Sequence, residues 1–169
     1  MHRIVVSDST AIIHLSRINA LQVLKAVYGE ILIPQAVFDE LLAGGTAQPG
    51  ALQVLNSTWI KKVKVQNAAI VARLSAHLDI GESEAIALAV ETGADVLIID
   101  EKMGREVARR LVPRIIGMVG ILLEAKKAGH IKEVKPLLLD LKKTGFKLGD
   151  DVLNYALAAA GEDKAAEAK

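Results

Sequence analysis

Short aliphatic runs that alternate with helix-like segments limit the fold of this sequence more than any other feature. Residues 4–6, 30–33 and 96–99 are each about as long as a buried strand, and each is followed by residues that begin a helix or stop a strand. Residues 114–116 predict a further strand, and residues 59–65 predict an edge strand whose lysines face water. The alternation predicts an α/β fold in which helices cover both faces of a parallel sheet.

The segments between these runs have the apolar spacing of helices, and most of them end at glycine, proline or asparagine. Asn19 is expected to divide the first of them into two short helices. Because no repeat or long linker interrupts the chain, residues 1–160 are expected to form one domain, and residues 161–169, rich in alanine and charge, a disordered tail. The other helices are expected over residues 35–43, 49–56, 68–77, 82–92, 103–111, 117–127, 132–143 and 150–160.

Composition excludes several classes of site. The 169 residues are 51% hydrophobic but only 3% aromatic, so the core must be aliphatic. The absence of cysteine excludes a disulfide scaffold, a thiolate zinc site and a cysteine nucleophile, and it fits a cytoplasmic protein. No apolar run approaches the roughly 18 residues of a membrane span. The net charge of +1 gives no support for non-specific binding to a nucleic acid duplex.

Two predicted strands end in an aspartate. Asp8 follows the run that ends at Val6 and Ser7, and Asp100 follows Ile98 and Ile99. Ligands of open α/β sheets bind beside the carboxyl ends of the strands. If the two strands are neighbours, both carboxylates lie at the same edge and repel each other, and a cation relieves that repulsion. Each aspartate also suits a simple helix cap, which is the alternative interpretation.

Four further acids lie on predicted helices. Asp39 and Glu40 border opposite sides of an apolar helix face, and helical spacing alone does not choose between them. Glu82 falls on the inward side of the helix that it opens, whereas Glu84 falls on the outer side with Leu88. Oxygen ligands alone favour a hard cation such as Mg²⁺ or Mn²⁺ over zinc. Acids around such an ion suit hydrolysis of phosphate esters.

These residues together resemble the PIN-domain family of metal-dependent ribonucleases. The likeness is strongest to a prokaryotic subgroup related to the toxin halves of VapBC-type toxin–antitoxin pairs, and it covers nearly the whole chain. The motifs that carry it, in chain order, are residues 5–9, residues 31–34 with Val37, Glu40 and Leu41, residues 81–89, residues 97–101 with Gly104 and Arg105, and the later residues 117–122, 125–126 and 145–146.

The resemblance implies a three-layer α/β/α fold around about five parallel strands, and a site whose acids are Asp8, Glu40 and Asp100 with a third position open to two residues. The spacing to Gly93 favours Glu82 there, and an acid before alanine favours Glu84. Because its inward position also favours Glu82, the expected catalytic acids are Asp8, Glu40, Glu82 and Asp100, with Glu84 as the second candidate for the third position. The metal ligands implied are Asp8, Glu40, Glu82 or Glu84, and Asp100, and the substrate contacts implied are Ser9 and Arg105.

The function implied is Mg²⁺- or Mn²⁺-dependent cleavage of single-stranded RNA, with the toxin of a type II toxin–antitoxin pair as one role. The partners implied are RNA, an antitoxin protein and a second copy of the chain, with no membrane. The alternative is a non-catalytic PIN-fold module that binds RNA or protein. A haloacid-dehalogenase-like phosphatase is disfavoured because Thr10 stands where it needs a second aspartate, and neither a Walker nor a Rossmann glycine loop occurs.

Overall fold

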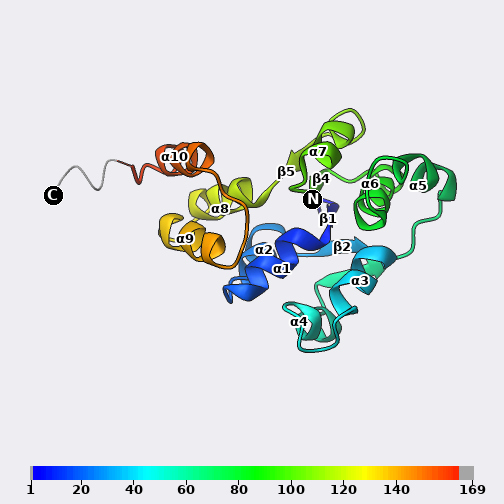
Figure 1. The fold of residues 1–169 in the computed structure, drawn as a ribbon, viewed down its shortest axis with the longest axis horizontal. Coiled ribbons are helices and arrows are strands. Elements are labelled where there is room, and N and C mark those ends of the chain that lie inside the picture. Colours follow the sequence, from blue (N-terminus) through cyan, green and yellow to red (C-terminus); the bar gives the residue numbers. More distant parts are fainter. Residues whose placement is uncertain (1, 164–169) are drawn as a thin grey trace.

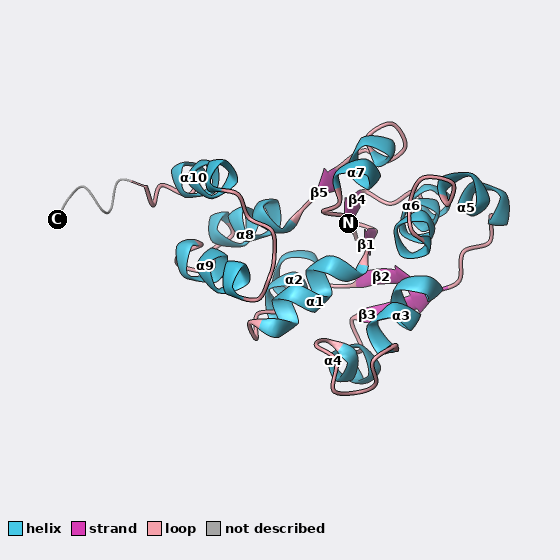
Figure 2. Ribbon diagram, in the orientation of Figure 1, coloured by secondary structure: helices cyan, strands magenta, loops and turns pink. Residues whose placement is uncertain are grey.

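A five-stranded parallel sheet forms the centre of the protein in the computed structural model, which describes residues 2–163 (Figure 1). The strand order is β3-β2-β1-β4-β5, so the chain starts in the middle of the sheet and crosses to both edges. Figure 2 shows the strands enclosed by helices. The predicted α/β fold is therefore confirmed. The strands are β1 (Val5–Ser7), β2 (Ile31–Pro34), β3 (Ile60–Val63), β4 (Val96–Ile98) and β5 (Ile115–Ile116).

The helices of the described residues follow the predicted segments closely. Residues near Asn19, which has a positive φ of 55°, divide the first segment into two helices as expected. Strand β3 lies at the edge of the sheet, also as expected, and its lysines are exposed. The helices are α1 (Ser9–Arg17), α2 (Gln22–Tyr28), α3 (Gln35–Leu42), α4 (Ala51–Asn56), α5 (Ala68–Leu74), α6 (Ile80–Thr92), α7 (Lys102–Ala108), α8 (Met118–Lys127), α9 (Lys135–Lys143) and α10 (Asp150–Ala159).

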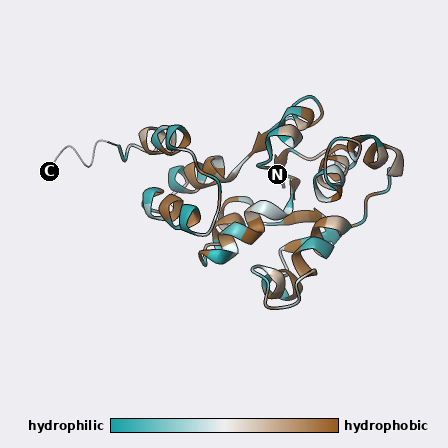
Figure 3. Ribbon diagram, viewed as in Figure 1, coloured by the Kyte–Doolittle hydropathy of each residue, from teal (hydrophilic) through white to brown (hydrophobic). Residues whose placement is uncertain are grey.

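Alternating strand residues build a core on each face of the sheet. Val5, Val96 and Ile98 point to one face, where α1, α2, α8 and α9 pack on them. Val6 and Leu97 point to the other face, against α6 and α7. Figure 3 shows that hydrophobic residues dominate the strands, whereas the helices carry both hydrophobic and hydrophilic residues. The molecule thus has the three-layer α/β/α architecture that the sequence predicts.

Helix α6 corrects one expectation. It begins at Ile80 rather than Glu82, because Asp79 caps it by accepting a hydrogen bond from the Glu82 N–H at 2.8 Å. Leu88, expected on an outer face with Glu84, is fully buried. The helix contacts the sheet, α3, α5 and α7, so it has no broad outer face, and a helical wheel could not sort its two glutamates.

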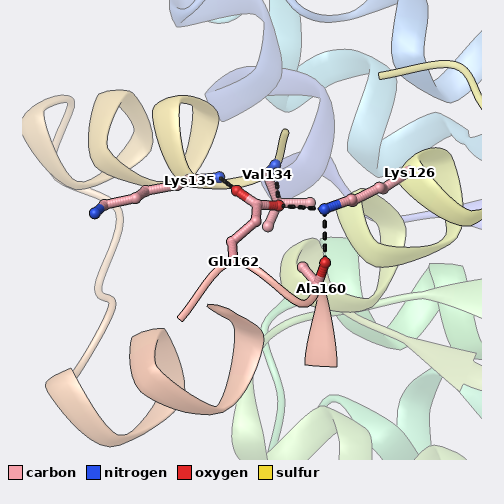
Figure 4. Close-up of polar contacts among 5 residues, drawn as sticks. All are labelled: Lys126, Val134, Lys135, Ala160 and Glu162. Atoms are coloured by element: carbon pink, nitrogen blue, oxygen red, sulfur yellow. Dashed lines mark hydrogen bonds and ion pairs between the residues drawn. The ribbon is translucent and has the colours of Figure 1, made fainter. Parts of the chain in front are cut away.

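The three helices after β5 form a group at one end of the molecule (Figure 1). Glu162 holds this group together, accepting hydrogen bonds from the Val134 and Lys135 N–H groups at 2.8 and 3.0 Å and from Lys126 Nζ at 2.9 Å (Figure 4). Lys126 Nζ also donates to the Ala160 carbonyl. We call these five residues the Glu162 node. It extends ordered contacts past residue 160; the last part of the expected tail, residues 164–169, lies outside the described residues.

Candidate active site at the carboxyl edge of the sheet

Asp8 lies directly beyond β1 at the edge where the parallel strands end. Its N–H donates to the Ile98 carbonyl at 3.0 Å, which continues the pairing of β1 with β4. Its Oδ1 accepts a hydrogen bond from the Thr10 N–H at 3.1 Å, so it caps α1. The residue is only 3% exposed. A single capping bond leaves a buried carboxylate poorly satisfied, because an ionised carboxylate can accept several hydrogen bonds.

Asp100 lies at the same edge, two residues after β4. Its Oδ1 accepts a hydrogen bond from the Met118 N–H at 2.9 Å, at the start of α8. Its Oδ2 is buried and has no hydrogen-bond partner among the described residues. Gly117 makes room for this arrangement, since a Cβ there would come within 2.6 Å of both Asp100 Oδ1 and Arg105 Nη1. The carboxylate is therefore half satisfied, with one oxygen held in place and the other left over.

Burial and nearby negative charge shift the pKa values of the carboxyl groups at this edge. Burial raises the pKa of Asp8 well above its usual range, and the charges of Asp100, Glu82 and Glu40 raise it further. Burial also raises the pKa of Asp100, although the Met118 N–H and the Arg105 guanidinium oppose the shift. Burial and like charge therefore disfavour the ionised form of these carboxyl groups. We call Asp8, Glu40, Glu82 and Asp100 the acidic edge.

Glu40 and Glu82 approach Asp8 from α3 and α6. Glu40 Oε2 lies where a Cβ on Gly81 would be 3.0 Å away, so a glycine in the first turn of α6 allows α3 close to it. Burial raises the pKa of Glu82, and the charges of Asp79, Glu101 and Glu40 add to the increase. Glu82 also accepts a hydrogen bond from the Asp79 N–H at 3.3 Å, which completes a capping box.

Glu84 lines a pocket together with Glu40, but its carboxylate is bonded to the start of α3. Its Oε1 accepts a hydrogen bond from the Ala36 N–H at 3.0 Å, in the first turn of α3. The residue that precedes α3 is Pro34, whose side chain cannot cap, so Glu84 satisfies a donor that would otherwise be free. It is not among the charges that raise the pKa of Asp8. Of the two candidate glutamates, Glu82 belongs to the acidic edge, whereas Glu84 caps the start of α3.

The remaining candidates also take definite places. Ser9 is buried next to Asp8 in the first turn of α1. Arg105 lies beside Asp100, whose pKa its charge lowers. Asp39 and Glu40 are both exposed, but Asp39 accepts a hydrogen bond from Gln35 at 2.7 Å, whereas the charge of Glu40 raises the pKa of Asp8. Glu101 caps α7 through a hydrogen bond from the Gly104 N–H.

Asp79 and the Met118 N–H were missed by sequence reasoning. Asp79 with Glu82 matches the capping-box spacing of an acid three residues before a glutamate, a signal that the sequence does contain. The contact of Met118 with Asp100 joins the end of one strand to the helix after the next strand, and no local pattern announces it.

The acidic edge fits a hard divalent cation, although its carboxylates are spread apart. Among residues 2–163, no three His, Asp or Glu side chains converge closely enough to form a ready-made metal-binding group. The unpartnered Asp100 Oδ2 and the carboxylate of Asp8 nevertheless supply oxygen donors of the kind that Mg²⁺ and Mn²⁺ prefer.

A groove of about 910 Å³ opens from this edge. Asp100 and Glu101 line it, together with residues of α1, α7, β5, α8, the 145–148 loop and α10. The groove thus adjoins the acidic edge at Asp100.

The strand order β3-β2-β1-β4-β5 makes β1 and β4 neighbours. This α/β fold therefore brings acids from distant parts of the chain, Asp8 and Asp100, to one edge of the sheet. The family model DUF3368, a PIN domain, matches residues 4–162. The chain therefore belongs to the PIN-domain family, whose fold is generally that of nucleases. No curated protein matches it. No helix among the described residues is both long and apolar enough to cross a membrane.

Proposed function

We propose that this protein is a Mg²⁺- or Mn²⁺-dependent endoribonuclease that cleaves single-stranded RNA at the acidic edge. The observation that carries the proposal is the pair formed by Asp8 and Asp100, which lie at the ends of adjacent strands with raised pKa values and one orphaned oxygen. A carboxylate pair serving only as helix caps would gain nothing from being buried together.

Each residue of the site has a role in this proposal. Asp8, Asp100 and Glu82 hold the cation, and Glu40 completes its ligands or orients a water. When bound, the ion neutralises phosphate charge and activates water for attack on phosphorus. Arg105, beside Asp100, contacts a phosphate and adds positive charge where negative charge develops. Ser9 offers a hydroxyl close to the reacting group. Glu84 is left out of the ligand set because it caps α3.

The test is cleavage of a labelled single-stranded RNA in Mn²⁺, compared between the wild type and carboxylate-to-amide variants. Glu40→Gln is expected to lower the rate strongly. Asp39→Asn, on the preceding residue of the same helix, is expected to leave the rate unchanged, because that carboxylate is bonded to Gln35 and is not among the charges that raise the pKa of Asp8. Equal rates for both variants would remove Glu40 from the site.

The second candidate is a non-catalytic module that binds RNA through the same edge. The spread of the carboxylates favours it, since no three of the described acids already converge. A protein of this kind would bind RNA and leave it intact in Mn²⁺ as in EDTA. The toxin role, the antitoxin partner and the homodimer remain predictions from the family resemblance, and co-purification with a product of a neighbouring gene would test the first two.

A further inference from the structure

The groove beside the acidic edge is lined by side chains of both charges. The acids Asp100 and Glu101 line it together with the cations Arg114 and Lys147, of which Lys147 is exposed. Glu124, the remaining acid of the groove, is already engaged, since it accepts hydrogen bonds from Arg114 and from Tyr28. The cations of the groove that remain available to a ligand are therefore Lys147 and Arg105, the second of which lies beside Asp100.

Part of the groove lining is apolar, and it includes an exposed aromatic ring. Tyr155 on α10 lines the groove and is 67% exposed, the most exposed of the large hydrophobic side chains. Val152, one turn earlier, is also exposed, and Phe146 packs edge-on against His14 with ring centroids 5.2 Å apart. Arg105 of α7, the helix that follows Asp100, lines the same groove as Val152 and Tyr155 of α10.

We propose that this groove holds the single-stranded RNA that the acidic edge cleaves, with one base stacked on Tyr155 and the backbone phosphates near Arg105 and Lys147. The inference rests on the proposed function, because it names the path of that substrate. An exposed aromatic ring beside separate cations is a combination that suits single strands, since bases stack on rings while phosphates pair with cations. Duplex bases already stack on one another and leave no face for Tyr155.

Binding is measured by fluorescence anisotropy of a labelled oligouridine in EDTA, which keeps the strand intact. Tyr155→Ala is expected to weaken binding about tenfold, as loss of one stacked base does, and Tyr155→Phe to bind within about twofold of the wild type because the ring remains. Lys147→Gln is expected to lower the slope of log affinity against log salt by about one. Leu139→Ala, which removes a partly exposed side chain outside the groove on α9, is the surface control and should bind as the wild type does.

The inference would be overturned if Tyr155→Ala bound as tightly as the wild type, if Tyr155→Phe lost as much affinity as Tyr155→Ala, or if a duplex of the same length showed the same dependence on Tyr155. Absence of single-strand binding by the wild type would also overturn it and would leave the groove to a protein segment. Tyr155→Ala is expected to melt at the wild-type temperature because the side chain is mostly exposed.

Cleavage in Mn²⁺ separates this inference from the proposed function. Tyr155-dependent binding without cleavage would defeat the nuclease and keep the groove as a strand-binding site. Cleavage with binding that ignores Tyr155 would keep the nuclease and defeat the groove.

Discussion

The acidic edge and the Glu162 node use the same chemical group in opposite ways. At the edge, Asp8 is buried among other acids with one hydrogen bond, and its pKa is raised. At the node, burial also raises the pKa of Glu162, but hydrogen bonds from Val134, Lys135 and Lys126 outweigh it and leave the pKa below its usual value. An ionised carboxylate therefore stabilises the fold where hydrogen-bond donors surround it, as at Glu162. Where other acids surround it, as at Asp8, its ionisation is unfavourable.

This difference teaches where to look for function. A carboxylate with a full set of donors has its charge accounted for within the fold, as Glu162 does. A buried carboxylate with an unpartnered oxygen and acidic neighbours lacks such donors, and it is therefore a candidate for binding a cation. Breaking each cluster should therefore have opposite consequences for stability and for activity.

The largest expected effect is on catalysis. Asp8→Asn should lower Mn²⁺-dependent RNA cleavage by at least about a hundredfold, because removing a group that organises charge at the reacting centre commonly costs that much. Glu162→Gln should cleave at the wild-type rate at temperatures where it is folded. Single-turnover cleavage of one labelled strand measures both. Unchanged cleavage by Asp8→Asn would defeat the catalytic assignment.

The next effect is on stability, and it reverses the order of the two sites. Glu162→Gln should destabilise the protein by about 2 kcal/mol, since hydrogen bonds to a charged acceptor are worth roughly that. Chemical denaturation measures the change. Glu133→Gln is the matched control, because Glu133 is an exposed glutamate just before α9. If both variants lost the same stability, the node would not be holding the C-terminal helices.

Asp8→Asn should instead leave the metal-free protein as stable as the wild type, or more stable by on the order of 1 kcal/mol. Asparagine keeps the cap on the Thr10 N–H, because it is as good a helix N-cap as aspartate, and it removes the charge that its neighbours repel. Thermal melting in EDTA checks this. A clear loss of stability would show that the charge of Asp8 is satisfied within the fold.

The smallest effect is the pH dependence of the node. The folded pKa of Glu162 lies below its usual value of 4.5, so the unfolded chain binds the proton more tightly. The stability that Glu162 contributes is therefore present above pH 4.5 and is lost as the pH falls through the folded pKa. The difference in melting temperature between the wild type and Glu162→Gln should be constant near neutrality and shrink below pH 4.5. A difference that grows in acid would reverse the sign of the shift.

The order of elements was within reach of the sequence because local patterns determine it. Aliphatic runs marked the strands, and the end of each run placed Asp8 and Asp100 correctly at one edge once β1 and β4 were adjacent. The partners of Glu84 and Glu162 were out of reach, because Glu84 bonds to a residue 48 positions earlier and Glu162 to one 28 positions earlier. Such bonds depend on how helices pack, and helical periodicity carries no information about that.

The central claim is that the acidic edge binds a divalent cation, and a titration of melting temperature with Mn²⁺ tests it without any RNA. At a hundredfold excess over its dissociation constant, the ion should stabilise the wild type by about 2.7 kcal/mol, or roughly 5 to 10 °C for a chain of this size. The account predicts that Asp8→Asn and Asp100→Asn lose this increase and that Glu84→Gln keeps it. An increase that persists in both aspartate variants, or none in the wild type, would contradict the account.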